Sequence, residues 1–261
     1  MAIKGAILGD ILGSQYEFGR PKKLDWKTVP LYQKSKCSFT DDTVMTLALK
    51  KAIVEKADLV KTMVEIGRKY PYAGYGGNFA NWIFSENHSP YNSWGNGSAM
   101  RVSFVGEYYE DYEEMQQVAV NTAAVSHNHP EGIKGAVVTA TCIWMAKHGK
   151  SKNEIYDYVL SEYPKERYDY SIVYSLEEIR PRYGWNESCQ GSVPVAMRCF
   201  YESADYESFM RNIYSLTCDS DTFGAIAGGV AEEFYGGFGN IPAEEILREH
   251  LTDELYDIMC M

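Results

Sequence analysis

The chain has 261 residues, and 45% of them are hydrophobic, so it is long enough to bury a large core and too apolar to be disordered. Its formal net charge is −11. That charge argues against tight nonspecific binding to nucleic acid or to an anionic membrane, because both need clustered cations.

Cysteine usage and hydropathy favour a cytoplasmic location. None of the six cysteines forms a Cys-x-x-Cys pair, so we expect reduced thiols rather than a zinc ribbon or a disulfide framework. Asp10 interrupts the apolar N-terminal stretch, which therefore does not read as a signal peptide. No apolar run approaches the roughly 20 residues that span a bilayer. We predict a cytoplasmic protein without a membrane partner, and we expect a monomer.

Most of the chain has the apolar periodicity of helices, near 3.6 residues. An apolar helix is expected at 2–13. Asp58 is expected to cap a helix that ends before Pro71. Pro130 and Gly149 mark the start and the end of another helix. The remaining predicted helices cover residues 42–56, 111–125, 151–162, 192–203, 205–216, 222–235 and 242–259.

Strand signals are weak, because no sustained alternation of period two is bounded by hairpin turns. Two segments, 70–97 and 163–191, read as irregular and are rich in Gly, Pro, Tyr and Trp. Long loops in compact domains are often binding elements. We therefore predict an all-α fold, an orthogonal helical bundle, with a single domain over residues 1–261.

The stretch "SFTDDTVMTLAL" contains an acidic helix start. Thr40 precedes Asp41 and Asp42, and an apolar helical pattern follows. A capping threonine with acids in the first turn satisfies free N–H groups and complements the helix dipole. Capping contributes about 1 kcal/mol, and on its own it would explain this stretch.

A second acidic start makes capping alone a weaker explanation. Asp219, Asp221 and Thr222 precede another helical pattern, which contains the paired glycines Gly228 and Gly229. Glycine inside a helix costs about 1 kcal/mol, so we expect another helix to approach closely there. If both starts converge, their oxygens would suit Mg²⁺, Mn²⁺ or Ca²⁺ rather than zinc. Without a cation, such carboxylates would repel one another.

Five motifs in order resemble the ADP-ribosylglycohydrolase family, the group that includes dinitrogenase reductase-activating glycohydrolase. The resemblance spans nearly the whole chain. The motifs are "GAILGDILGSQYEF" (5–18), "FTDDTVMTLAL" (39–49), "GNGSAMRVS" (95–103), "SHNHPEGIKGA" (126–136) and "DSDTFGAIAGGVAEEFYG" (219–236). Each motif alone is a weak signal, whereas five in the family order are specific.

The resemblance implies an ADP-ribosyl glycohydrolase with two divalent cations, Mg²⁺ or Mn²⁺. Such enzymes cleave the bond between ADP-ribose and a modified acceptor, which is a protein side chain, a nucleobase or a small metabolite. Ribose hydroxyls are expected at the metals, and Glu17, Asp41 or Asp42 would position or deprotonate the attacking water. The metal ligands carried over from the family motifs are Thr40, Asp41, Asp42, Asp219, Asp221 and Thr222.

The middle motifs would bind the substrate. By the resemblance, the Asn-Gly loop would cradle the diphosphate, and a histidine before a helix would contact ADP-ribose. Taken alone, these features read as a plain loop and a helix cap. Arg101 is either a phosphate partner or part of a structural ion pair, and we favour the ion pair. The aromatic residues of both irregular segments either stack on adenine or pack the loops. The predicted substrate-binding residues are Asn96, Gly97, Ser98, Met100 and His127.

Two departures from the family pattern leave an alternative open. Residues 70–85 contain no acid, although some family members carry a catalytic aspartate there, and Thr217 and Cys218 replace a glycine pair. The alternative is a regulatory pseudoenzyme that binds ADP-ribose without turnover. Retention of both acidic starts favours the enzyme. An all-α pyrophosphatase is disfavoured, because it would need a Glu-Glu-x-x-Glu helix or a His-Asp pair, and the sequence contains neither.

Overall fold

The computed structural model describes residues 2–261, which form fifteen helices and no strand. The prediction of an all-α fold is therefore confirmed. The helices are α1 (Ala2–Glu17), α2 (Asp41–Glu55), α3 (Leu59–Lys69), α4 (Gly77–Phe84), α5 (Gly97–Met100), α6 (Ser103–Tyr108), α7 (Tyr112–Ala124), α8 (Pro130–Lys147), α9 (Lys152–Glu162), α10 (Leu176–Ile179), α11 (Cys189–Tyr201), α12 (Tyr206–Tyr214), α13 (Ser220–Tyr235), α14 (Ala243–His250) and α15 (Asp253–Cys260).

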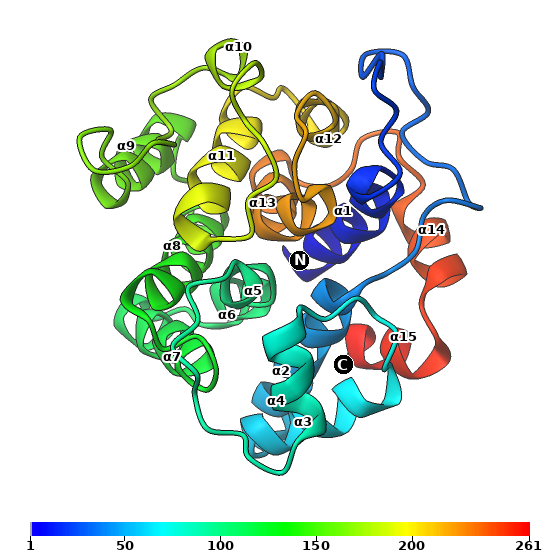
Figure 1. Cartoon of the computed structure of the whole chain (residues 1–261), viewed down its shortest axis with the longest axis vertical. Helices are drawn as coiled ribbons and strands as arrows, with labels where there is room; N and C mark the ends of the chain where they lie inside the picture. Colours follow the sequence, from blue (N-terminus) through cyan, green and yellow to red (C-terminus); the bar gives the residue numbers. More distant parts are fainter. Residues whose placement is uncertain (1) are drawn as a thin grey trace.

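Helices α1 and α13 lie side by side at the centre of the fold, with the other helices arranged around them (Figure 1). Glycines let the two backbones touch. A Cβ atom added at Gly9 would lie 2.2 Å from the carbonyl oxygen of Gly224, and one at Gly5 would lie 2.3 Å from that of Gly228. The close approach expected at the glycines of the second acidic motif is therefore present, and its partner is the N-terminal helix.

Most predicted helix boundaries agree with the structure within a few residues, because side-chain caps determine them. The Thr40 hydroxyl accepts from the Asp42 amide at the start of α2, and the Asp58 carboxylate accepts from the Lys61 amide at the start of α3. Ser151 and Glu154 form a capping box at the start of α9.

Four predicted boundaries were wrong. The first helix continues past residue 13 to Glu17, so the predicted site residue Glu17 is the last residue of α1. The segment 70–97 is not wholly irregular, because it contains α4, whose buried face packs on α3. The segment 163–191 is not wholly irregular either, because it contains α10 and the first residues of α11. The predicted helix 242–259 is two helices, because Leu251 is extended and the Thr252 hydroxyl accepts from the Leu255 amide to begin α15.

Among the helices of residues 2–261, none combines the length and the hydropathy of a membrane span. This agrees with the apolar runs of the sequence, which are short and interrupted by polar residues.

Candidate functional site

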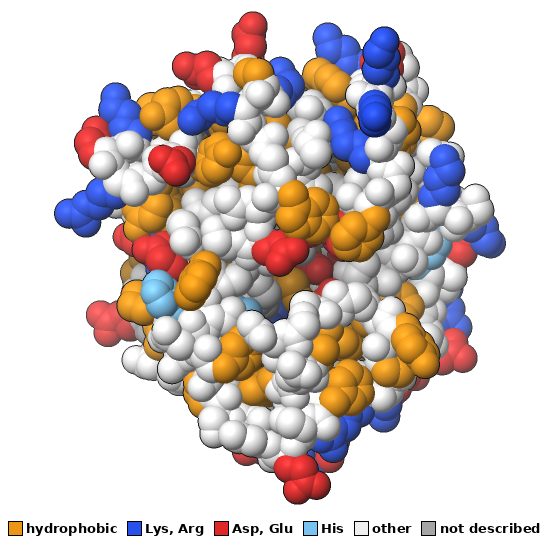
Figure 2. All heavy atoms as spheres, viewed as in Figure 1, with side chains coloured by type: hydrophobic (Ala, Val, Ile, Leu, Met, Phe, Trp, Pro, Cys, Tyr) orange, Lys and Arg blue, Asp and Glu red, His pale blue; other side chains and the backbone are white. Residues whose placement is uncertain are grey.

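A cavity of about 260 Å³ opens where the C-terminal end of α1 meets the first turns of α2, α4, α5 and α13. Figure 2 shows a hollow near the centre of this face, with acidic side chains between hydrophobic ones. Thr40 and Ser98 are not among the lining residues. The predicted site residues that do line the cavity are Glu17, Asp41, Asp42, Asn96, Gly97, Met100, His127, Asp219, Asp221 and Thr222.

The first acidic start contributes two carboxylates to the cavity. The Asp41 amide donates to the Ala73 carbonyl at 2.8 Å, which fixes the segment before α4 against the start of α2. One oxygen of Asp42, Oδ2, lies 3.1 Å from the Thr40 hydroxyl and 3.4 Å from the Thr222 hydroxyl. The other, Oδ1, is buried and has no hydrogen-bond partner among the described residues.

Asp10, on α1, is a site residue that sequence reasoning missed. Its Oδ2 accepts from the amides of Thr40 (2.9 Å) and Thr43 (3.1 Å) and from the Thr43 hydroxyl. Its Oδ1 accepts from the Thr40 hydroxyl at 2.8 Å. Asp10 therefore holds the start of α2 against α1. The available signal was an acid in the middle of a mainly apolar helical pattern, because charged groups are rarely fully buried without a partner.

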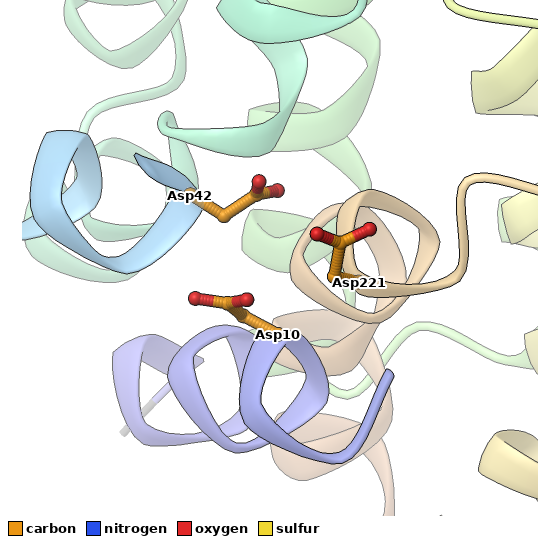
Figure 3. Close-up of side chains that lie close together, drawn as sticks. All are labelled: Asp10, Asp42 and Asp221. Atoms are coloured by element: carbon orange, nitrogen blue, oxygen red, sulfur yellow. The ribbon is translucent and has the colours of Figure 1, made fainter. Parts of the chain in front are cut away.

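The second acidic start lies opposite the first. Asp219 occupies the N-cap position of α13 but makes no capping hydrogen bond with its side chain. Its Oδ2 instead accepts from Asn96 Nδ2 at 2.8 Å. Asp221 Oδ1 is buried and has no hydrogen-bond partner among the described residues. Figure 3 shows the carboxylates of Asp10, Asp42 and Asp221 close together, carried by α1, α2 and α13.

The carboxylates are close enough to share a cation. Oxygens from Asp10, Asp42 and Asp221 all lie within 4.8 Å of one another, and so do oxygens from Glu17, Asp219 and Asp221. Asp221 belongs to both sets. Because the two sets share one residue and contact one cavity, they form a single continuous acidic centre.

Burial and mutual repulsion disfavour the ionised forms of these groups. Burial, followed by the charges of neighbouring carboxylates, raises the pKa of Asp42 and of Asp221 well above the usual range. Burial raises the pKa of Asp10 to about 6, although hydrogen bonds from Thr43 and Thr40 oppose the shift. Burial, together with the charge of Asp219, raises the pKa of Glu17 to about 7.

The described residues provide no cation that pairs with this centre. Within residues 2–261, no Lys or Arg side chain forms an ion pair with any of its carboxylates. Buried carboxylates normally have a charged or hydrogen-bonding partner. The two partnerless oxygens, Asp42 Oδ1 and Asp221 Oδ1, are therefore the places where an external cation fits best.

The Asn-Gly loop forms a wall beside the acidic centre, because Asn96 donates to Asp219. The Asn96 amide donates to the Glu187 carbonyl at 2.7 Å, so the loop is fixed by the segment before α11. Ser98, predicted to bind substrate, is buried behind the wall and donates to the Gly132 carbonyl at 2.7 Å. His127 stands beside the loop, with its Nε2 3.0 Å from the position of a Cβ added at Gly97.

Arg101 lines the same wall, and the favoured structural ion pair is not formed. Its side chain is fully buried and lies over the Phe79 ring, with Cζ 5.4 Å from the ring centroid. Nη2 donates to the Thr122 carbonyl and to the Ser126 hydroxyl, both at 2.9 Å. Nε and Nη1 have no partner among the described residues. The cavity therefore has one buried positive charge in its wall.

Aromatic side chains surround the opening. Phe18 and Trp185 stack with ring centroids 5.5 Å apart, although they come from distant parts of the chain. Phe79 and Tyr91 line the interior and lie next to the His127 ring. Aromatic residues of both irregular segments thus reach the cavity, whereas Tyr72 is 98% exposed and is not among its lining residues.

Comparisons with known proteins identify the family. The chain is 25% identical to ADP-ribosylhydrolase ARH3 of Mus musculus, over 90% of this chain and 82% of that protein. It is also 25% identical to the ARH3 of Homo sapiens, over 90% and 84% of the two chains. A solved structure, described as an ADP-ribosylglycohydrolase-related protein complex, superposes with a TM-score of 0.73 at 24% identity, over 98% of this chain and 93% of that one. The ADP-ribosylglycohydrolase profile matches residues 1–259, and the chain belongs to that family.

Proposed function

We propose that this chain is a divalent-metal-dependent hydrolase that cleaves the glycosidic bond between ADP-ribose and a modified acceptor. The observation that carries the proposal is the acidic centre, in which Asp42 and Asp221 line the cavity and each has a buried oxygen, Oδ1, without a hydrogen-bond partner among the described residues. The family and the ARH3 relatives support ADP-ribose as the substrate class.

The donor set suits Mg²⁺ or Mn²⁺, because all of its atoms are oxygens and no histidine or thiol takes part. When bound, the cations would offset the carboxylate charges and act as Lewis acids toward substrate and water oxygens. Asp10 would support the ligands by holding the start of α2, since its Oδ2 already accepts three hydrogen bonds. The proposed ligand residues are Thr40, Asp41, Asp42, Asp219, Asp221 and Thr222.

Glu17 is the proposed proton carrier. Its raised pKa of about 7 lets it hold and release a proton near neutral pH. It is half-buried at the end of α1 and lines the cavity, so it reaches both the solvent and the acidic centre. Glu17 would take the role of the catalytic acid that residues 70–85 lack, because it supplies a carboxylate to the cavity. Asp41 and Asp42 also contact the cavity and would orient the reacting water.

The wall formed by the Asn-Gly loop, beside the acidic centre, would hold the rest of the substrate. Asn96, Gly97, Met100 and His127 line it, and Phe79 and Tyr91 present aromatic rings to the interior. Gly97 has no side chain, so a ligand can approach the backbone of the loop closely. We do not include Ser98, because its hydroxyl already serves to join α5 to the start of α8.

The decisive experiment measures ADP-ribose release from a panel of ADP-ribosylated arginine, serine, nucleobase and acetyl substrates. Each substrate is tested with Mg²⁺, with Mn²⁺ and after treatment with EDTA. We expect release from at least one substrate, and we expect EDTA to abolish it. Binding of ADP-ribose without any release would contradict the proposal and favour a binding protein.

Variants separate the metal centre from the fold. Asp221→Asn should lose at least a hundredfold in kcat, because Asp221 belongs to both carboxylate sets, while its circular dichroism remains native. Asp157→Asn is the matched control, since Asp157 is an exposed acid on α9 that does not line the cavity. Full activity of a folded Asp221→Asn protein would rule out the metal assignment.

A further inference from the structure

A chain of hydrogen bonds runs behind the cavity wall from Arg101 through Ser126 to His127. Arg101 Nη2 donates to Ser126 Oγ at 2.9 Å, and Ser126 Oγ lies 2.8 Å from His127 Nδ1. Arg101 and Ser126 are both fully buried. The other ring nitrogen, His127 Nε2, has no hydrogen bond to any described residue and lies beside Gly97 on the cavity side. The two nitrogens of His127 therefore have different environments.

The direction of each bond follows from the chemistry of the groups. A guanidinium only donates, so the Ser126 oxygen must accept from Arg101. The Ser126 proton then needs an acceptor, and His127 Nδ1 is the only acceptor near Ser126 Oγ among the described residues. The opposite direction, with Nδ1 as donor, would leave a buried hydroxyl proton without an acceptor, which is costly. Nδ1 is therefore the acceptor, and a neutral ring must carry its proton on Nε2.

The surroundings also keep the ring neutral. Burial, and then the positive charge of Arg101, hold the pKa of His127 well below its usual range. The charge of Arg101 is not cancelled by any ion pair within residues 2–261. Phe79 and Tyr91 flank the His127 ring, and neither side chain carries a charge at neutral pH that would favour a protonated imidazolium.

We infer that Ser126, held by Arg101, is a positioning residue that fixes His127 as the tautomer protonated on Nε2, so that this wall presents a permanent hydrogen-bond donor to an anionic oxygen of the ligand. In the proposed function, on which the ligand identity rests, that oxygen belongs to the diphosphate of ADP-ribose. Ser126 does not line the cavity, so it acts only through His127.

The tautomer can be measured directly in the unmodified protein. Long-range proton–nitrogen correlation spectra of ¹⁵N-histidine-labelled protein distinguish a protonated from an unprotonated ring nitrogen. The chain has five histidines, and His127→Phe identifies the signal to follow, since it keeps a ring without nitrogens. We expect Nε2 protonated and Nδ1 unprotonated from pH 6 to pH 8. A proton on Nδ1, or averaging of the two tautomers, would overturn the inference.

Ligand binding tests the consequence, with ADP-ribose and Mg²⁺ in a calorimeter. Ser126→Ala should raise the Kd for ADP-ribose roughly fivefold to tenfold, as expected for the loss of one buried hydrogen-bond partner. It should also mix the two tautomers in the nitrogen spectrum. In the His127→Phe background, Ser126→Ala should cause no further loss of affinity, because it acts through the ring. Equal losses in both backgrounds would show that Ser126 is merely structural.

The matched control is Ser171→Ala. Ser171 is also fully buried and donates one hydrogen bond, to the Tyr163 carbonyl, but it does not line the cavity. It should leave the tautomer and the Kd unchanged, and a change in either would mean that any buried serine has this effect. The spectrum needs no catalysis. A protein with the expected tautomer but no ADP-ribose release would therefore refute the proposed function and leave the inference intact.

Discussion

Replacing Gly9 by alanine should separate the two central helices. The new Cβ would lie 2.2 Å from the Gly224 carbonyl oxygen and 2.4 Å from the Gly224 carbonyl carbon, whereas ordinary contact begins at 3.4 Å. Relief therefore needs a shift of about 1 Å between two backbones, since no flexible side chain can move aside. Overpacking lowers the free energy of unfolding by up to about 3 kcal/mol, whereas the higher helix propensity of alanine raises it by about 1 kcal/mol. The net loss of stability is about 2 kcal/mol.

The same shift should weaken cation binding, because Asp10 is next to Gly9 and Asp221 lies on the facing helix. Thermal unfolding without Mg²⁺ and at rising Mg²⁺ concentrations, up to the point where the Tm changes only slowly, measures both effects. We expect a Tm about 4–8 °C lower than that of the native chain for a loss of this size. We also expect a smaller rise in Tm on adding Mg²⁺.

The control is Gly184→Ala, because a Cβ atom at Gly184 would meet no other atom within 4 Å. It should leave both the Tm and the Mg²⁺ response close to native. If Gly9→Ala unfolds at the native temperature with a native response to Mg²⁺, the helix contact does not position the acidic centre, and the reasoning fails.

Three further outcomes follow from the charges and caps of the structure. In EDTA-treated protein, the free energy of unfolding should fall as the pH rises from about 4.5 to about 7. Glu17 has a higher pKa in the folded protein (about 7) than in the unfolded chain (4.5), so its protonated form stabilises the fold. That stabilisation is complete below pH 4.5 and is lost as the pH rises through about 7. Denaturant titrations in that pH range should show a shallower fall for Glu17→Gln, and an equal slope would contradict the assignment. Lys152→Met should cost about 1 kcal/mol, since the ammonium donates to carbonyls at the end of α11, whereas the exposed Lys150→Met should be neutral. Thr252→Val should cost about 1 kcal/mol by removing the cap of α15, and an unchanged midpoint of urea unfolding would refute that role.

Local signals in the sequence predicted the helices well, because capping residues and apolar periodicity act over a few residues. Thr40 and Asp58 are examples, since each cap lies next to the helix that it begins. The break at Thr252 was missed because apolar residues continue across it at helical spacing, and the cap was read as part of one longer helix.

The acidic centre could be predicted only in part, because its members meet through tertiary contacts. The two acidic starts were recognisable as motifs, but Asp10 was not, since its role depends on α1 lying against the start of α2. Ser98 lies within a recognisable loop motif, yet its hydroxyl points to Gly132 rather than to the cavity. The chain of hydrogen bonds to His127 likewise requires Arg101, whose hydrogen-bond partners lie 21 and 25 positions away in the sequence.

The pairing of α1 with α13 also has a consequence for how the protein is made. The Ser220 hydroxyl donates to the Gly13 carbonyl, and these residues are 207 positions apart. At typical synthesis rates, the first helix leaves the ribosome roughly 10 to 40 s before its partner exists. During that interval the apolar side chains and the glycines of α1 cannot pack against α13, their partner in the folded protein. The emerging N-terminal helix is therefore where we expect chaperones to act, and the acidic centre can assemble only near the end of translation.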